Sequence, residues 1–121
     1  MVKYFFDSYA VVEVIKGNPY YARYTKEPVV ITISNLAEIY WAALNDLSEE
    51  EAEEIYSHYR QTVMDINDEI LKDAIKFRKR YKKKNLSYTD CIGYIFALKN
   101  NLKFLTGDKE FKDMSNVEFV K

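Results

Sequence analysis

Four acidic residues stand where a folded chain could use them together for chemistry. Asp7 and Asp108 each follow a short apolar segment, while Glu38 and Asp90 fall near the starts of predicted helices. Ligands of open α/β sheets bind outside the carboxyl ends of the strands, and carboxylates gathered there repel one another unless a cation neutralises them. Magnesium and manganese take oxygen ligands, and such a site can activate a water and clamp a phosphodiester. The pattern therefore favours metal-dependent hydrolysis of phosphodiester bonds.

A length estimate supports a shared sheet edge. A helix from Asp90 to Asn100 runs roughly 15 Å at ~1.5 Å per residue. A strand from Leu102 to Thr106 returns roughly 16 Å at ~3.3 Å per residue, so Asp108 comes back to about the level of Asp90. The segment that joins the other two acids likewise goes out along a helix and returns along a strand, and all four acids can share one edge.

Each acid also has a purely structural explanation. Asp7 could cap the helix that follows it, and Asp108 suits a Gly-Asp turn. Two pairs have the spacing of a capping box, in which the residue before the helix and the third residue of the helix bond reciprocally: Asn35 with Glu38, and Ser87 with Asp90.

The elements that must position these acids alternate between strands and helices. The apolar and β-branched segments predict strands at 2–6, 29–33, 102–106 and 117–120, with a short candidate at 62–66. Helical spacing and capping signals predict helices over 10–15, 36–44, 48–61, 67–81 and 87–97. Such alternation favours an α/β fold with a mostly parallel sheet. No repeat or linker divides the chain, so we expect one domain.

Composition excludes several other kinds of protein. The chain has 121 residues, of which 48% are apolar, and a net charge of −1, so disorder and a globally basic nucleic-acid binder are both disfavoured. Cys91 is the only cysteine and His58 the only histidine, which makes a zinc site improbable. No Gly-rich phosphate loop and no apolar run of about 18 residues occurs. We expect a cytoplasmic protein, because one cysteine cannot form an internal disulfide.

The order of the acids resembles that of PIN-domain ribonucleases, and within them the small VapC-type toxins of toxin–antitoxin pairs. Four segments carry the resemblance: FFDSYAVVEVI, ISNLAEIYWAAL, LSYTDCIGYIFA and FLTGDKEF. Each motif alone is loose, but four in this order over nearly the whole chain are fairly specific. The resemblance implies a single PIN-like domain over residues 1–121, with a three-layer α/β/α architecture.

The resemblance also implies an activity and a site. Members of the family cleave RNA endonucleolytically with magnesium or manganese, are restrained by a cognate antitoxin and are usually homodimers. By resemblance the metal-binding and catalytic acids are Asp7, Glu38, Asp90 and Asp108, with Ser8 and Thr106 as hydroxyls beside them. Either Glu110 or Asp113 could supply a fifth acid. Two alternatives stay open, both non-hydrolytic: a magnesium-binding, receiver-like signalling module, and a PIN fold that binds RNA without cutting it.

Two surfaces are expected to serve association. Lysines lie on the side of the 67–81 helix opposite its predicted inner face of Ile70, Leu71, Ala74, Ile75 and Tyr81. This stripe, the densest candidate for RNA phosphate contacts or otherwise a solvated face, consists of Lys72, Lys76, Lys79 and Lys83. Apolar residues such as Tyr40 and Trp41 occupy more than one face of the 36–44 helix, which predicts a homodimer.

Overall fold

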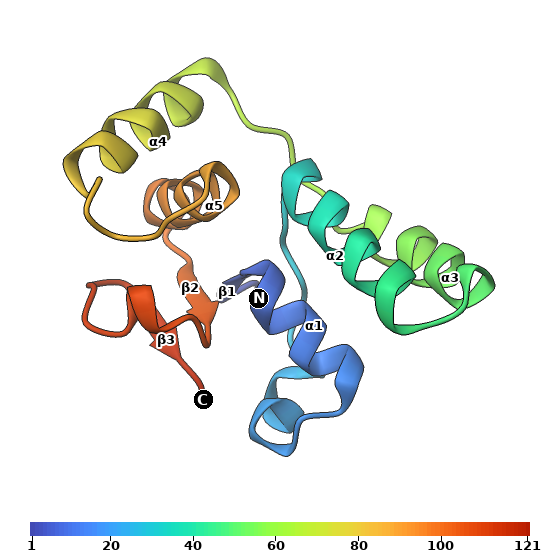
Figure 1. Ribbon diagram of the computed structural model, residues 1–121. Helices are drawn as coiled ribbons and strands as arrows, with labels where there is room; N and C mark the ends of the chain where they lie inside the picture. The colour runs from blue at the N-terminus through green and yellow to red at the C-terminus, as the bar shows by residue number, and fades with distance from the viewer.

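The computed structural model describes all 121 residues. Three strands and five α-helices follow one another along the chain, with two short 3₁₀ helices between them (Figure 1). The elements are β1 (Tyr4–Phe6), α1 (Ser8–Lys16), η1 (Pro19–Tyr24), α2 (Ile33–Asp46), α3 (Glu49–Arg60), α4 (Asp68–Arg80), α5 (Tyr88–Lys99), β2 (Lys103–Thr106), η2 (Lys109–Phe111) and β3 (Val117–Phe119).

The sheet has the strand order β1-β2-β3, and all of its strands are parallel. Phe5 pairs with Phe104 and Phe6 with Leu105, so neighbouring side chains point to the same face. Because side chains alternate along a strand, Phe5 and Phe104 enter one apolar cluster while Phe6 and Leu105 enter the other. The parallel register also brings the carboxyl ends of β1 and β2 to one edge.

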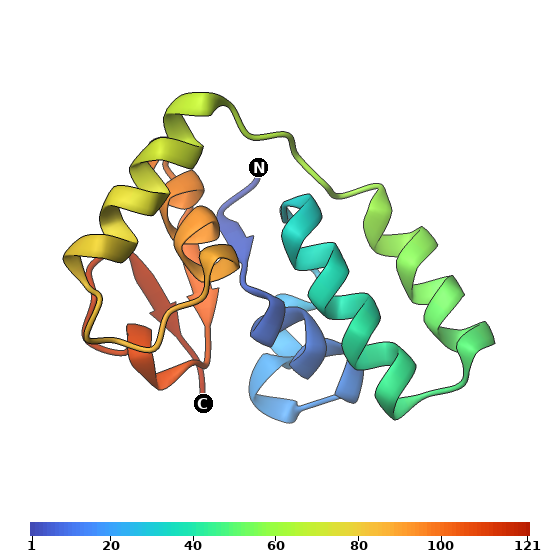
Figure 2. The ribbon, with the colours of Figure 1, turned by 45° about the horizontal axis from the view of Figure 1, so that its top comes forward.

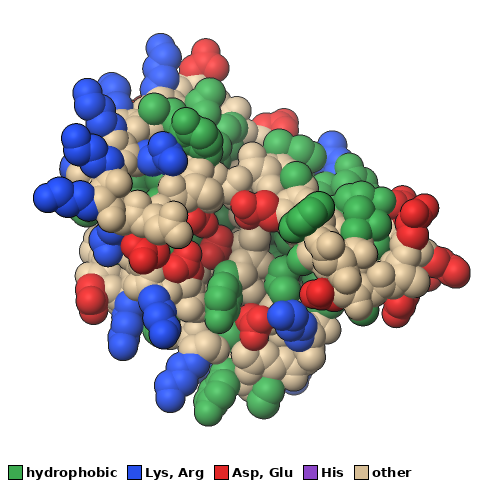
Figure 3. All heavy atoms as spheres, viewed as in Figure 1, with side chains coloured by type: hydrophobic (Ala, Val, Ile, Leu, Met, Phe, Trp, Pro, Cys, Tyr) green, Lys and Arg blue, Asp and Glu red, His purple; other side chains and the backbone are tan.

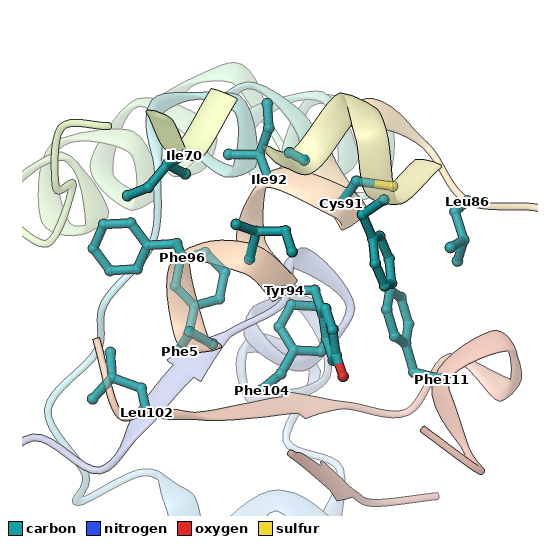
Figure 4. Packing of buried hydrophobic residues seen from close by; sticks show 14 residues of the cluster. Phe5, Ile70, Leu86, Cys91, Ile92, Tyr94, Phe96, Leu102, Phe104 and Phe111 are labelled. Atoms are coloured by element: carbon teal, nitrogen blue, oxygen red, sulfur yellow. The ribbon is translucent and has the colours of Figure 1, made fainter. Parts of the chain in front are cut away.

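Helix α5 covers one face of the sheet and α4 packs on the outer side of α5, and the larger cluster lies among them (Figure 4). Helix α5 is buried along most of its length, and its Tyr94 ring stacks between Phe77 and Phe111 with centroids 4.9 and 5.7 Å away. At the start of the same helix Cys91 is fully buried. Burial raises the pKa of its thiol to about 11, which agrees with the role of a packing residue.

Helices α1 and α2 cover the opposite face, and α3 packs against α2 (Figure 2). Ala10 and Val11 of α1 join Phe6 and Leu105 in the second cluster, together with Leu36 of α2. The sheet therefore lies between two helical layers, which confirms the predicted three-layer α/β/α fold. No helix is both long and apolar enough to cross a lipid bilayer.

The predicted strands at 29–33 and 62–66 are wrong: they shrink to an isolated parallel bridge between Ile31 and Val63. The first segment lies beside β1, since the Phe6 amide donates to the Val30 carbonyl at 3.0 Å. Helix α2 begins directly after Thr32, whose backbone and side chain take part in a capping box. Because the helix starts there, the β-branched segment forms only one bridge, at Ile31.

The predicted inner face of α4 is partly wrong. Ile70, Ala74 and Phe77 are buried at the spacing of one helical stripe, whereas Leu71 and Ile75 are 43% and 42% exposed. The buried stripe is narrow, because α4 packs on α5 and not on the sheet itself. Lysines and apolar residues therefore share the outer surface of α4.

Helix α2 leaves an apolar surface uncovered, but not the whole of the predicted one. Tyr40 is satisfied within the chain, since its ring packs edge-on against Tyr56 of α3 and its hydroxyl donates to Glu53. Trp41 is 69% exposed and Leu44, one turn further on, is 40% exposed.

We predict that the chain forms a homodimer that buries Trp41. In sedimentation at micromolar concentration the protein should run at about twice the 14.4 kDa of one chain. Trp41→Glu should weaken the dimer by about tenfold or more, because buried tryptophans dominate interface energies. Tyr20→Ser removes another exposed aromatic ring, 62% exposed in η1, and should leave the dimer intact. A wild-type protein that sediments only as a 14.4 kDa species contradicts the prediction.

Candidate metal-binding active site

Asp7 lies at the junction between β1 and α1, where the parallel strands end. Its backbone occupies the N-cap position of α1, but its side chain makes no capping hydrogen bond. The carboxylate, 3% exposed, instead accepts a hydrogen bond from the Thr106 hydroxyl, with 2.7 Å between Oγ1 and Oδ2. The capping explanation for this acid is therefore wrong. A buried aspartate without a capping bond is a costly group for the fold to keep.

Thr106 connects the ends of two neighbouring strands. It is the last residue of β2. Its hydroxyl donates a hydrogen bond to Asp7 and accepts one from the Asp108 amide at 3.0 Å. Asp108 in turn caps η2, since its Oδ1 accepts from the Glu110 amide at 2.9 Å. The hydroxyl predicted beside the acids thus holds Asp7 and the backbone of Asp108 in one geometry.

Glu38 lies in the second turn of α2, and a hydrogen bond links its carboxylate to Ser8, the first residue of α1. The Ser8 hydroxyl donates to Glu38, with 2.6 Å between Oγ and Oε1, and accepts from the Asn35 side-chain amide at 2.9 Å. Asn35 is fully buried, and its Oδ1 accepts from both the amide and the hydroxyl of Thr32. This chain of hydrogen bonds orients the Glu38 carboxylate.

The capping box of α2 is therefore Thr32 with Asn35, and the predicted pairing of Asn35 with Glu38 is wrong. Sequence reasoning missed the positioning role of Asn35. The signal available was that Thr32 precedes Asn35 by the capping-box spacing. Spacing alone did not show that the Asn35 side-chain amide also donates to Ser8 of α1.

Asp90 caps a helix, which is the structural explanation that the sequence offered for this acid. It forms the capping box of α5 with Ser87, since its Oδ2 accepts from the Ser87 amide at 2.9 Å. The other carboxylate oxygen, Oδ1, has no hydrogen bond within the chain. The cap fixes the side chain and leaves one oxygen available to a ligand.

The four carboxylates affect one another electrostatically. The pKa of Asp7 is raised to about 8, mainly by burial and then by the negative charges of Asp90, Glu38 and Asp108, while the Thr106 hydrogen bond opposes the increase. Burial also raises the pKa of Asp90, with smaller increases from Asp108 and Glu38 and a lowering by its bonds to Ser87. The acids therefore lie within electrostatic reach of one another.

No lysine or arginine compensates this charge. None of the three salt bridges in the chain involves Asp7, Glu38, Asp90 or Asp108. Figure 3 shows acidic side chains gathered on one face, with basic side chains on both sides of them. A buried aspartate surrounded by further carboxylates and lacking a cationic partner fits a site for a cation.

The carboxylate oxygens of these acids suit an ion that keeps several of its waters better than an ion bound by protein ligands alone. No group of three or more His, Cys, Asp and Glu side chains is arranged to hold a metal ion on its own. Magnesium commonly binds through only one or two carboxylates and keeps several waters. An all-oxygen donor set of this kind therefore fits magnesium or manganese.

The other candidates make different side-chain contacts or are exposed. The Glu110 carboxylate accepts from the Asn85 amide at 3.1 Å and so ties the loop after α4 to η2, while Asp113 is exposed. His58 is exposed on α3. The candidate RNA-binding lysines are all exposed, but the helix ends at Arg80 and only three of them lie on it: Lys72, Lys76 and Lys79, with Lys83 beyond its end.

The chain matches known proteins in family and in fold. The family model of the PIN domain matches residues 4–117. Mycobacterium tuberculosis VapC20, described as a sarcin-ricin loop cleaving toxin, superposes with a TM-score of 0.79 at 15% identity, covering 98% of this chain and 100% of that one. No curated protein sequence matches the chain significantly.

Two further solved structures are similar in fold. The toxin–antitoxin complex from Klebsiella pneumoniae gives a TM-score of 0.74 at 19% identity and covers 96% of each chain. VapBC2 from Rickettsia felis, bound to a DNA fragment from its promoter, gives 0.70 at 16% identity and covers both chains completely. At these identities the likeness concerns the fold.

Proposed function

This chain belongs to the PIN-domain family, and we propose that it is a metal-dependent endoribonuclease acting as the toxin of a toxin–antitoxin pair. The observation that carries the proposal is the buried Asp7 carboxylate, which lies among three further acids with no cationic partner. The fold neighbours support the toxin assignment, because one is a sarcin-ricin loop cleaving toxin and another is a toxin–antitoxin complex. The family match gives no support to a receiver-like signalling module.

Asp7, Asp90 and Asp108 would hold the magnesium or manganese ion, directly or through its bound waters, and Glu38 would help to ligate it or orient a water. When bound, the ion supplies Lewis acidity for the scissile phosphate and lowers the pKa of a ligating water. The chain's own residues keep the acids in place: Thr106 holds Asp7, and Ser8 holds Glu38. Because the Thr106 hydroxyl donates to Asp7, it favours the ionised form of that carboxylate, which a cation requires.

The proposed partner is an antitoxin protein. The neighbour from Klebsiella pneumoniae was solved as a toxin–antitoxin complex, and this chain and the matched chain cover 96% of each other. The apolar groove between α1 and α2 is a surface of this chain that such a protein could cover. A short antitoxin-like reading frame directly upstream of the gene would support the pairing.

The test of the activity is an incubation of the pure protein with mixed RNAs, with EDTA and with added manganese, followed by mapping of the cut ends. The proposal expects internal cuts that appear only with the metal. Binding of RNA without any cut, with manganese present, would favour the alternative of a non-hydrolytic PIN fold.

The basic stripe on α4 gives a separate prediction. Lys79→Glu combined with Lys83→Glu should lower RNA affinity at low salt and flatten its salt dependence by about 1.4 in slope, at about 0.7 per phosphate contact of a single strand. Both side chains are exposed and outside every salt bridge, so thermal stability should change little. Unchanged affinity would leave the stripe as a solvated face that complements the helix dipole.

A further inference from the structure

A second basic surface borders the carboxylate edge. An open groove of about 760 Å³ is lined by Tyr9, Gly107, Lys109, Lys112, Phe119 and Lys121. Tyr9 follows Ser8 at the start of α1, and Gly107 lies between Thr106 and Asp108. The groove therefore borders the acids, because the segments around Tyr9 and Gly107 contribute both to the groove wall and to the acidic edge.

The charge of this groove is uniformly positive. Three of the six lining residues are lysines, none is acidic, and no salt bridge in the chain uses Lys109, Lys112 or Lys121. Only Lys121 has another partner among charged or aromatic groups, with its Nζ 5.9 Å from the centre of the Tyr20 ring. Ammonium groups without a carboxylate partner beside a strongly acidic edge are suited to a polyanion.

The aromatic part of the groove depends on Gly107. The Tyr9 side chain is 42% exposed and Phe119 is partly buried. A Cβ added to Gly107 would collide with Cε1 of Tyr9 and would lie 2.6 Å from the Tyr21 hydroxyl. The glycine thus lets the Tyr9 ring lie directly over the backbone that leads from Thr106 to Asp108.

We propose that this lysine–aromatic groove binds the single-stranded RNA segment that flanks the scissile phosphate, with phosphates at the lysines and one unstacked base on Tyr9. The inference rests on the proposed ribonuclease activity and names the form of its substrate. Single strands combine a charged backbone with bases free to stack on aromatic rings, whereas the bases of a duplex are already stacked. The α4 surface offers lysines, but the exposed Tyr88 ring beside it is already covered on one face by the Arg78 guanidinium, 4.4 Å from the ring centre.

In Figure 3 basic side chains lie on two sides of the acidic patch, which would give an RNA strand a path longer than the groove alone. Basic side chains over α4 lie on one side of the acidic patch, and further basic side chains near β3 and the C-terminus lie on the other. A strand bound on both sides would carry one of its phosphodiesters across the acids. The groove and the stripe then hold opposite flanks of the cleaved bond.

The first test measures binding without cleavage, using a short fluorescein-labelled single-stranded RNA in EDTA. Lys109→Glu combined with Lys112→Glu should weaken binding at low salt by about tenfold or more and flatten the salt slope by about 1.4. The matched control is Lys3→Glu combined with Lys103→Glu, which makes the same charge change at exposed positions before β1 and at the start of β2. These lie at the amino ends of the strands, opposite the acids, and the control should bind nearly as the wild type does.

The second test separates stacking from charge. Tyr9→Ala should weaken single-strand binding by about 5- to 160-fold, the usual effect of losing one stacked base, while Tyr9→Phe should restore it. A duplex of the same sequence should bind more weakly than the single strand and be insensitive to Tyr9→Ala. Equal losses in the groove variant and its control, or no loss in either, would overturn the groove assignment.

The outcomes also distinguish the groove from the activity on which it rests. If the wild type cuts RNA with manganese and the groove variants bind it normally, the groove is wrong and the ribonuclease proposal stands. If the wild type cuts nothing but the groove variants lose single-strand binding as expected, the groove is right and the chain is an RNA-binding PIN fold.

Discussion

Asp7→Asn is expected to lower metal-dependent RNA cleavage by about 100-fold or more, because a metal ion contributes several kcal/mol of charge stabilisation. The amide keeps the shape of the side chain and can still accept the hydrogen bond from Thr106. It removes the negative charge that lies deepest among the four acids. The measurement is the initial rate of cleavage of one RNA at saturating manganese.

The same substitution should not unfold the protein. Because Asp7 is buried and its pKa is raised, a neutral amide relieves a charge that the metal-free fold tolerates poorly. The matched control is Asp65→Asn, the same chemical change at an exposed acid, which should cut at the wild-type rate. A wild-type rate for Asp7→Asn would remove Asp7 from the site, whereas a loss in both variants would point to a general effect of charge.

Raising the pH from about 4 to about 8 is expected to destabilise the metal-free protein. The pKa of Asp7 is about 8 in the folded chain and near its ordinary value of 3.8 in the unfolded chain. Between these values the folded state holds a proton that the unfolded state has lost. Stability is therefore greatest below pH 4 with respect to this group, and it falls by up to about 1.4 kcal/mol per pH unit until the folded carboxyl ionises.

Thermal unfolding in EDTA at a series of pH values measures this slope. Each kcal/mol corresponds to roughly 4 °C in Tm for a chain of this size. Asp7→Asn should flatten the profile, and manganese should raise the Tm of the wild type most at the alkaline end, because the cation binds the ionised carboxylates. A wild-type profile that does not depend on pH, or a variant with an unchanged slope, would show that Asp7 is ionised in the metal-free fold.

Local sequence determined the positions of the acids along the chain. The apolar segments before Asp7 and Asp108 form β1 and β2, and an acid that directly follows a parallel strand lies at the carboxyl edge of the sheet whatever the rest of the chain does. The capping box of Ser87 and Asp90 was equally legible, because both partners lie within one turn. The order of the four motifs was sufficient to identify the PIN-domain resemblance.

Tertiary structure decided the features that depend on contacts between distant segments. Asn35 orients Glu38 only because Ser8, 27 residues earlier, reaches its amide. The β-branched segment after Pro28 forms a single bridge, between Ile31 and Val63, because the capping box of Thr32 starts helix α2 at the next residue. Leu71 and Ile75 remained exposed because α4 meets only one helix. The groove required Tyr9 and Phe119, 110 positions apart, to face one cavity. Periodicity and propensity report on neighbours in the chain, whereas these outcomes were decided by packing between elements.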